Sequence, residues 1–392
     1  MTAHELRASA SLASIFALRM LGLFLILPVF AVHARGLPGG ADAAMVGLAM
    51  GIYGLTQALL QLPFGAASDR FGRKPVIVAG LVLFAAGSFL AAGADTVLGV
   101  IAGRALQGAG AISAAVTAFV ADSTRDSQRT KAMAMVGGSI GLTFAVSLVA
   151  APALYAVIGM GGIFALTGVL ALGAILVTMF VVPPAPPSEL PERPARLREV
   201  AMEPDLMRLN VGIFVLHAVQ MAMFVVVPRW LVERAGLPLG EHWKLYLLVV
   251  VLSFVVMVPP MLWGERQGRL RAVFLAAVAL LLSVQLIFFA QPSGLIPLAV
   301  LMFGFFAGFN ILEATLPSMV SRLAPADAKG AAMGIYNTTQ SIGLFVGGAL
   351  GGWVMQRWGG VAVFAMCAAL LVVWLGVAAG QRRWPAPRLA KG

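Results

Sequence analysis

The chain has 392 residues, of which 60% are hydrophobic and 11% are charged, with a formal net charge of +11. Water-soluble domains carry charges on about 25% of their residues, so this composition excludes an ordinary soluble globular protein. The positive charge does not indicate nucleic-acid binding here, because Lys and Arg collect in the cytoplasmic loops of membrane proteins. We therefore expect the lipid bilayer, and no nucleic acid, as the principal partner.

The predicted elements are apolar runs of about 20 residues, the length that crosses the hydrocarbon core of a bilayer as a helix. The alternating pattern of barrel strands is absent, so the sequence predicts an all-α membrane protein. The N-terminal half, residues 1–182, holds predicted helices at 12–32, 44–67, 76–94, 97–120, 131–153 and 161–182. The C-terminal half, residues 206–392, holds predicted helices at 206–231, 243–263, 272–290, 294–319, 330–355 and 361–380, followed by a short basic tail.

Residues 183–205 separate the two halves and begin with PPAPPSELPERP. Proline and charge make this stretch a poor membrane helix, so it is predicted to be a cytoplasmic linker. An even number of helices places both termini on one side of the membrane. If that side is the cytoplasm, about 20 of the 27 Lys and Arg residues face it, as the positive-inside rule requires. We expect 12 transmembrane helices with cytoplasmic N- and C-termini.

The segment 65–77, GAASDRFGRKPVI, lies between the second and third predicted helices. Its charged residues are Asp69, Arg70, Arg73 and Lys74, with Gly72 among them. They are too polar for hydrocarbon, so we expect a short loop at the membrane face. A weaker copy follows 196 residues later, half the length of the chain, as Glu265, Arg266, Gly268 and Arg269. This repeat predicts two pseudo-symmetric six-helix halves, a plan known for secondary transporters.

The same segment resembles the signature loop of the major facilitator superfamily, G-x-L-a-D-R-x-G-R-R/K. It departs from that pattern at Ala67, where the family often has leucine. Gly65 permits close helix approach and Gly72 a tight turn. Asp69 can face the positive N-terminal end of a neighbouring helix.

The resemblance implies that Asp69 faces the predicted helix that begins near Gly330, a contact that would latch the two halves on the cytoplasmic side. Arg73 is expected to pair with Asp122, at the cytoplasmic end of the fourth predicted helix. The alternative is that the basic residues only set the topology of the chain, as Lys and Arg do in most cytoplasmic loops. Arg70 and Lys74 fit that alternative better than Asp69 does.

A second motif, RALQGAG at residues 104–110, resembles the family pattern R-x-x-Q-G-x-G. Arg104 would lie inside a membrane helix, where a charge costs several kcal/mol unless it is paired or hydrated, so it is functional by default. The alternative is a structural arginine bound to backbone carbonyl groups of the first predicted helix.

Arg19 and Glu313 are the other full charges at depth, each six to eight residues from a cytoplasmic helix end, or roughly 10 Å. We expect Glu313 to bind and release a coupling proton with Arg19 as its competing partner. Low dielectric favours the neutral carboxyl group, whereas a nearby guanidinium favours the ionised one. A static buried ion pair is the alternative.

Neutral polar residues recur on the predicted helices that would line a substrate cavity. They are Tyr53, Gln57, Gln61, Gln107, His217, Gln220, Asn310, Asn337 and Gln340. Gln57 and Gln61 are four residues apart and therefore share one helix face. For any one of them alone, a hydrogen bond between helices is the more common role. Several phenylalanines on the same helices favour lipophilic or amphiphilic cargo.

Residues 19–24, RMLGLF, and 309–318, FNILEATLPS, resemble the YajR-type branch of drug:proton antiporter-like facilitators. Members of that branch can carry a soluble C-terminal domain, which we do not expect here because about a dozen residues follow the last predicted helix. Exporters of the superfamily often carry G-x-x-x-G-P-x-x-G-G on the fifth helix. Here Gly141 is followed by Ala150, Ala151, Pro152 and Ala153, a departure that weakens the antiporter interpretation.

These features predict a secondary active transporter of the bacterial inner membrane. It would work by alternating access and couple efflux of a small amphiphilic or lipophilic substrate to protons. An importer or uniporter on the same fold and a non-transporting membrane receptor are the alternatives. We expect a monomer with no enzymatic activity, cofactor or metal, because the sequence has neither a Cys/His ligand cluster nor a G-x-x-x-x-G-K-[S/T] phosphate loop.

Overall fold

The computed structural model describes residues 1–184, 197–325 and 328–385. The chain divides into two compact units, unit 1 at residues 1–194 and unit 2 at residues 195–392. Every regular element in the described ranges is a helix, which confirms the all-α fold class. Residues 185–196 of the predicted linker and 386–392 of the predicted tail lie outside the described residues.

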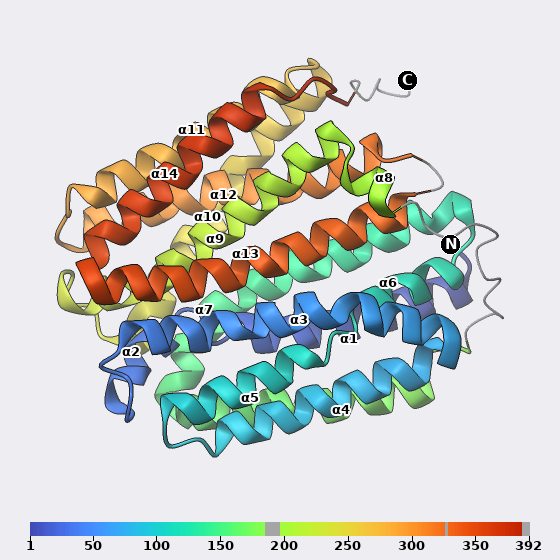
Figure 1. The fold of residues 1–392 in the computed structure, drawn as a ribbon, viewed down its shortest axis with the longest axis horizontal. Coiled ribbons are helices and arrows are strands. Elements are labelled where there is room, and N and C mark those ends of the chain that lie inside the picture. Colours follow the sequence, from blue (N-terminus) through green and yellow to red (C-terminus); the bar gives the residue numbers. More distant parts are fainter. Residues whose placement is uncertain (185–196, 326–327, 386–392) are drawn as a thin grey trace. The chain divides into compact units, whose positions relative to one another are not determined.

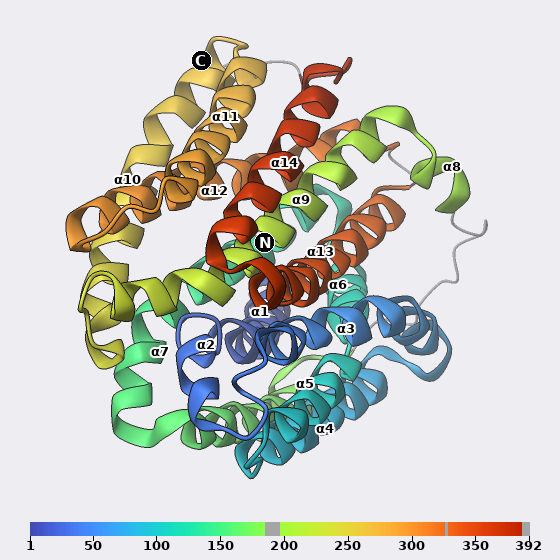
Figure 2. The same ribbon diagram turned by 60° about the vertical axis from the view of Figure 1, so that its left-hand side comes forward.

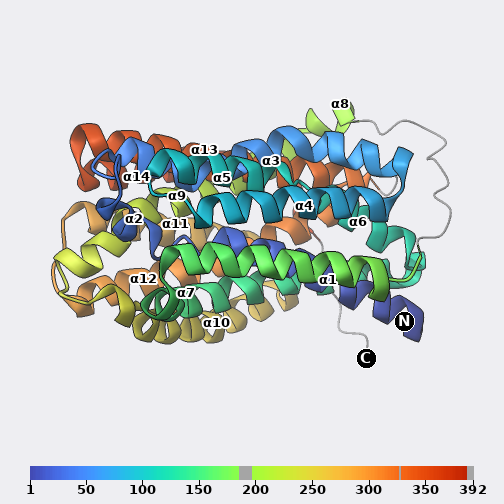
Figure 3. The same cartoon turned by 90° about the horizontal axis from the view of Figure 1, so that it is seen from below.

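Unit 1 consists of α1 (Ala3–Phe24), α2 (Phe30–His33), η1 (Ala34–Gly36), α3 (Ala43–Phe71), α4 (Arg73–Ala92), α5 (Val97–Ala109), α6 (Ser113–Asp122), α7 (Asp126–Leu176) and η2 (Val177–Val181) (Figure 1). Helix α7 is two helical parts joined at Gly159, whose φ of +65° lies in the left-handed region that favours glycine. Figure 3 shows the chain turning back at this kink, so α7 supplies both the fifth and the sixth predicted helices.

Unit 2 consists of α8 (Leu197–Ala201), α9 (Pro204–Glu233), η3 (Leu239–Glu241), α10 (His242–Arg266), α11 (Leu270–Phe289), α12 (Leu295–Leu323), α13 (Lys329–Trp358) and α14 (Gly360–Ala379) (Figure 2). The short helix α8 lies within the segment that the sequence predicted as linker. Helix α9 begins at Pro204, whose fixed φ suits the first position of a helix.

Ten helical segments of the described residues are long and apolar enough to cross a membrane. One of them, residues 131–181, contains the kink at Gly159 and so covers two predicted helices. Helix α13, with 30 residues, is outside this set. All twelve predicted segments therefore contain helix, while the number of membrane crossings and the cytoplasmic location of the termini remain predictions.

The two units repeat one packing pattern. In unit 1, α1 packs along α7, and α4 packs against α5 and α7. In unit 2, α9 packs along α13, and α11 packs against α12 and α14. These packed helices occupy equivalent places in the chain order, with α7 of unit 1 corresponding to both α13 and α14 of unit 2.

Glycines allow α13 to approach α9 closely. A Cβ atom at Gly347 would lie 2.2 Å from the carbonyl oxygen of Ala218, and one at Gly343 would lie 2.5 Å from that of Phe214. Small residues spaced four apart are the usual way in which membrane helices pack backbone to backbone. This contact fixes the register between His217 on α9 and Gln340 on α13.

Two predicted helix boundaries are wrong for local reasons. The first helix was expected at 12–32, but α1 begins at Ala3, because Thr2 and Glu5 form a capping box at its N-terminus. It ends at Phe24, and turns at residues 25–29, which contain Pro28, precede α2. The fourth helix, expected at 97–120, is broken between α5 and α6, where Gly110 leaves the helical region of φ and ψ.

The expected loop at the charged segment is also wrong. Helix α3 continues through Asp69 and Arg70 to Phe71, and α4 begins at Arg73, so Gly72 alone separates them. Its φ of +91° is the left-handed turn that glycine permits. A helix satisfies its own backbone hydrogen bonds in water as well as in lipid, so charged side chains do not end it where it leaves the membrane.

Candidate functional site

Two arginines occupy the interior of unit 1. Arg19 on α1 is 1% exposed and Arg104 on α5 is fully buried. Both guanidinium groups lie against the ring of Tyr53 on α3, with Cζ 5.5 Å from the ring centroid for Arg19 and 4.8 Å for Arg104. Such contacts are attractive because the ring face carries partial negative charge. We call Arg19, Arg104 and Tyr53 the arginine cluster.

Each arginine of the cluster is held through the same terminal nitrogen. Arg104 Nη1 donates to the carbonyl oxygen of Gly22 at 3.1 Å and to Gln107 Oε1 at 2.9 Å. The bond to Gly22 is the one expected from the alternative interpretation of Arg104, in which a structural arginine binds backbone carbonyl groups of the first helix. Arg19 Nη1 donates to Ser113 Oγ at 2.6 Å. In both residues Nε and Nη2 are buried without a hydrogen-bond partner among the described residues.

The predicted polar face of α3 is present beside the cluster. Gln57 and Gln61 are 5% and 1% exposed. Gln57 Oε1 and both amide atoms of Gln61 make no hydrogen bond within the described part of the chain. Gln107 differs, because its Nε2 also donates to Ser88 Oγ at 2.7 Å and ties α5 to α4. Gln107 therefore acts as a bond between helices, and the face of Gln57 and Gln61 keeps unused polar groups.

Unit 2 has a different polar centre, which joins His217 on α9, Glu313 on α12 and Gln340 on α13. The amide nitrogen of Gln340 lies 2.7 Å from His217 Nε2, and His217 Nδ1 lies 3.2 Å from the carbonyl oxygen of Ile213. These partners suit a neutral imidazole that donates through Nδ1 and accepts through Nε2. Glu313 Oε2 is 3.7 Å from Nε2. We call these three side chains the acid–histidine cluster.

The contact between His217 and Glu313 escaped the sequence analysis, which considered Arg19 as the partner of Glu313. Arg19 lies in unit 1 and Glu313 in unit 2, so that ion pair, and the part of Arg104 in proton coupling, remain predictions. No sequence spacing links two residues 96 positions apart. The signal that was available is chemical, because His217 and Glu313 are ionisable groups placed deep in two apolar helices.

The other predicted cavity residues of unit 2 play mixed roles. Asn310 Nδ2 donates to Ser253 Oγ at 2.9 Å and connects α12 to α10, the helix-to-helix role that is common for such residues. Gln220 is 1% exposed and its Oε1 has no partner among the described residues. Asn337 is half-buried on α13, one turn before Ser341, whose hydroxyl donates to the Asn337 carbonyl oxygen.

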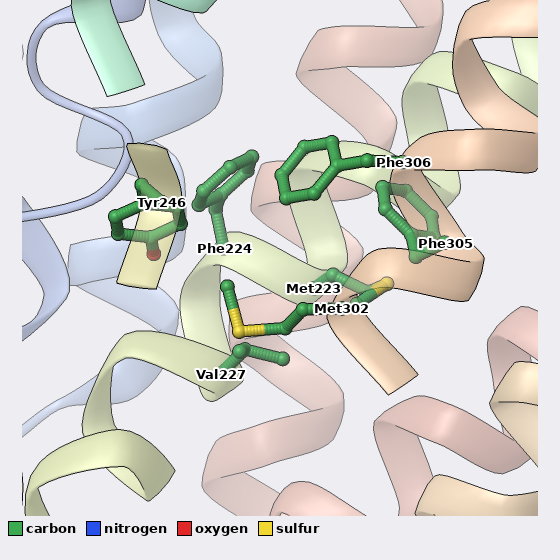
Figure 4. A pocket seen from close by; sticks show the side chains of 7 residues that line it. All are labelled: Met223, Phe224, Val227, Tyr246, Met302, Phe305 and Phe306. Atoms are coloured by element: carbon green, nitrogen blue, oxygen red, sulfur yellow. The ribbon is translucent and has the colours of Figure 1, made fainter. Parts of the chain in front are cut away.

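A small apolar cavity lies between α9, α10 and α12 (Figure 4). Its lining is Met223, Phe224, Val227, Tyr246, Met302, Phe305 and Phe306. Its volume of about 10 Å³ is room for about one water molecule. The cavity is therefore too small for a substrate in this state of the molecule, but its aromatic and methionine lining agrees with the apolar surroundings expected from the sequence.

The charged segment makes its contacts within unit 1. Arg73 Nε donates to Asp122 Oδ2 at 2.8 Å, the expected pair, and Nη1 donates to Ser68 Oγ at 2.7 Å and to Asp69 Oδ1. Arg73 is 7% exposed, so one buried guanidinium joins the ends of α3, α4 and α6. Lys74 Nζ donates to the carbonyl oxygen of Val182, directly after η2, at 2.5 Å.

The remaining predicted members of this segment are placed as follows. Asp69 is 46% exposed, and Arg70 is exposed with its guanidinium 5.4 Å from the Phe71 ring centroid. Gly65 packs on α6, where an added Cβ would lie 3.2 Å from Ala114. Gly330 is exposed in the first turn of α13. Asp69 and Gly330 lie in different units, so their contact remains a prediction.

The repeated segment in unit 2 has an analogous but weaker bridge. Glu265 near the end of α10 lies 3.8 Å from Arg322 in the last turn of α12. Gly268 has a φ of +67° between α10 and α11, as Gly72 has between α3 and α4. In unit 1 the residue beside the glycine turn is the basic Arg73, and its partner at the end of α6 is an acid. In unit 2 the residue near the glycine turn is the acidic Glu265, and its partner at the end of α12 is basic.

An ion pair between exposed Arg125 and buried Glu5 ties the connection between α6 and α7 to the start of α1. Arg125 donates to Glu5 through Nε at 2.8 Å and through its backbone amide at 3.1 Å. Hydrogen bonding to this carboxylate raises the pKa of the Arg125 guanidinium above its ordinary value.

The sequence of this chain is similar to a family of transporters and to individual bacterial proteins. A model of the Major Facilitator Superfamily matches residues 12–347 and 245–389. The inner membrane transport protein YajR of Escherichia coli (strain K12) is 43% identical over 98% of this chain and 85% of its own length. The multidrug resistance protein MdtH of Aeromonas salmonicida (strain A449) is 27% identical over 85% of this chain and 82% of its own.

A solved structure has a similar fold. It is a bacterial homologue of the human lysosomal transporter Spinster, in an inward-facing and occupied conformation. The TM-score is 0.77 at 12% sequence identity, over 98% of this chain and all of that one. At that identity the likeness concerns the fold alone.

Proposed function

The chain belongs to the major facilitator superfamily, and from this premise we propose that it exports small amphiphilic or lipophilic compounds in exchange for protons. It is a multi-pass transporter of the bacterial inner membrane and not an enzyme. The proposal concerns the coupling ion, the direction of transport and the class of cargo.

The acid–histidine cluster carries the proposal of proton coupling. Glu313 Oε2 is buried without a hydrogen bond in the described residues, and the nearest ionisable nitrogen is His217 Nε2 at 3.7 Å. An ionised side chain inside a membrane helix costs about 3 kcal/mol, a cost that protonation removes. Gln340 holds His217 in place, so a change in the packing of α9, α12 and α13 alters the surroundings of Glu313 and with them its affinity for a proton.

Two observations support export of apolar cargo. MdtH, a relative at 27% identity, is named for multidrug resistance. The side chains that α9, α10 and α12 direct into their shared cavity are aromatic or methionine, apart from Val227 (Figure 4). Methionine and aromatic surfaces adapt to ligands of varied shape.

The charged segment supplies the proposed control of the transport cycle. Asp69 keeps acceptor capacity because it is 46% exposed and bonds to Arg73 through one oxygen. The amides at the start of α13 follow Ala328, a residue without a capping side chain. We propose that Asp69 accepts hydrogen bonds from these amides when the cytoplasmic side closes, since a helix N-terminus favours a carboxylate. Arg73 and Asp122 hold Asp69 in position.

Flux through the full-length protein in liposomes tests proton coupling. Amphiphiles that carry a positive charge, no charge or a carboxylate would be assayed with and without an imposed pH gradient. We expect the gradient to accelerate export of at least one compound, and Glu313→Gln to reduce that acceleration at least tenfold. His217→Gln should lower it less, because glutamine can still bind Gln340.

Glu241→Gln is the matched control, because Glu241 is half-exposed and pairs with Lys244 outside the acid–histidine cluster. It should transport as the unaltered protein does. Gradient-driven flux that survives Glu313→Gln would refute the role of Glu313. If the imposed pH gradient does not change flux through the unaltered protein, the protein is instead a uniporter.

A further inference from the structure

The arginine cluster is a buried concentration of positive charge, and the described helices α1, α3, α5 and α6 of unit 1 bring no acid to it except at their ends. From Ala43 to Ser68 and from Thr96 to Ala121, the chain contains Arg104 but no Asp or Glu. On α1 the only acid is Glu5, in the first turn, where it binds Arg125. Asp42 and Asp122 stand at the ends of α3 and α6. Two full positive charges in such a place need an anion to offset the cost of burial.

The unused donors of the two arginines belong to one particular edge of the guanidinium. In both residues Nη1 is occupied by the protein, while Nε and Nη2 are buried and have no partner in the described residues. The N–H bonds of Nε and Nη2 point the same way and match the two oxygens of a carboxylate, which they bind as a fork. Buried charged donors without partners are costly, so this edge is prepared for an acceptor.

The surroundings suit the rest of an amphiphilic anion. Tyr53 presents its ring to both guanidiniums, and the amide groups of Gln57 and Gln61 continue the polar face along α3 with unused donors and acceptors. Gly108 lets α5 approach α3, because a Cβ there would lie 2.2 Å from the Tyr53 carbonyl oxygen. The cluster is thus built into the helix packing and does not depend on a loop.

We propose that the arginine cluster binds the carboxylate of an anionic amphiphile, with the guanidinium edges of Arg19 and Arg104 as its donors and Tyr53 against its apolar part. The inference rests on the proposed transport function and narrows its cargo to organic acids. Arg104 and Arg19 are held in place by Gly22, Gln107 and Ser113, so the site is formed before the anion arrives.

Binding to the purified full-length protein in detergent tests this inference without flux. The probes are a panel of arylalkyl carboxylates of increasing size, beginning with 1-naphthaleneacetate, each paired with its neutral amide. Affinities would be taken from thermal stabilisation of the protein. We expect carboxylates to bind at least tenfold more tightly than their amides.

Arg19→Lys keeps the charge but loses the fork, so it should reduce the carboxylate preference about tenfold while the amide affinity stays unchanged. Arg271→Lys is the matched control, because Arg271 lies in unit 2 and donates to the Ala379 carbonyl oxygen. It should bind as the unaltered protein does. Arg104→Lys is expected to have the same effect as Arg19→Lys, and if it fails to fold, Arg19→Lys alone decides the question.

Three results would overturn the inference. The first is equal affinity for carboxylates and for their amides. The second is stabilisation by sodium chloride as large as that by the carboxylates. The third is carboxylate binding that appears only in Glu313→Gln, which would show that an acid of the protein fills the cluster. Failure of the two proposals is distinguishable. Proton-driven flux of cationic or neutral compounds without carboxylate binding would refute this inference and leave the proposed function standing. Carboxylate binding without proton-driven flux would refute the proposed function and leave the carboxylate site standing.

Discussion

The two units have the same helix packing but opposite chemistry at their centres. In unit 1, α1 and α5 bring Arg19 and Arg104 onto Tyr53. In unit 2, the equivalent helices α9 and α12 bring His217 to Glu313. Arginine stays charged at all physiological pH values, whereas histidine and glutamate gain and lose protons. The two units therefore share one helix packing, but the centre of unit 1 carries fixed positive charge and the centre of unit 2 carries groups that can titrate.

The difference extends to how tightly equivalent helices pack. The contact of α13 with α9 depends on backbone approach at Gly343 and Gly347, whereas nothing lies within 4 Å of a Cβ built at Gly141 on α7. Position 141 on α7 therefore has space for a side chain, whereas positions 343 and 347 on α13 have none. We expect position 141 to tolerate a larger residue that positions 343 and 347 do not.

The largest expected effect tests this contrast. Gly343→Ala places a methyl group 2.5 Å from the Phe214 carbonyl oxygen, and the resulting overpacking should destabilise the protein by about 3 kcal/mol. Gly141→Ala is the matched change in unit 1 and should be neutral or stabilising, because alanine favours helix by about 1 kcal/mol. Thermal unfolding and yield in detergent measure both. Equal losses in the two variants would remove the contrast.

The charged turns give a second, smaller contrast. Asp122→Asn removes a carboxylate charge from Arg73, which is 7% exposed, and should cost about 2 kcal/mol because a buried guanidinium exchanges a charged acceptor for a neutral one and keeps only Asp69 as an ionised partner. Glu265→Gln in unit 2 should cost about 0.5 kcal/mol or less, since that bridge spans 3.8 Å between partly exposed groups. Denaturation in detergent compares the two. A larger loss in Glu265→Gln would contradict the greater importance of the turn in unit 1.

The smallest expected effect concerns the conformational equilibrium. Asp69→Asn keeps a hydrogen-bonding group beside Arg73 but removes the charge that would face the start of α13. It should shift the protein toward the inward-open state about fivefold, or ~1 kcal/mol, with little change in stability. Cysteine probes on the cytoplasmic side of a Cys367→Ala protein would report accessibility. Glu265→Gln serves as control, and unchanged labelling of Asp69→Asn would argue against the latch.

Much of the fold could be predicted because lipid imposes a simple rule. Each apolar run of about 20 residues had to be a helix, and each of those predicted contains one. The same reasoning failed between Asp69 and Arg73, because hydropathy reports where a chain leaves the membrane and not where its helix ends. It also missed the break at Gly110, which lies inside an apolar run and follows from close packing against Gly80.

The residues of the candidate sites could be predicted from the sequence, but only some of the contacts between them could. Arg73 and Asp122 could be paired because each stands at a helix end on the same predicted side of the membrane. His217 and Glu313 could not, since their meeting depends on the rotation of α9 and α12 about their axes. The contact of Gly343 and Gly347 with α9 constrains one of these helices, and such packing cannot be read from a single sequence.

The bond from Lys74 Nζ to the Val182 carbonyl oxygen has a mechanical consequence. Val182 is the last residue before the proline-rich stretch that leads out of unit 1, and Lys74 directly follows Arg73, which joins three helix ends. The point where the chain leaves the last helical segment of unit 1 is therefore bound to the residue next to the one that joins the ends of α3, α4 and α6. A displacement of the chain at Val182 would therefore be transmitted through this hydrogen bond to the start of α4, directly after the turn at Gly72.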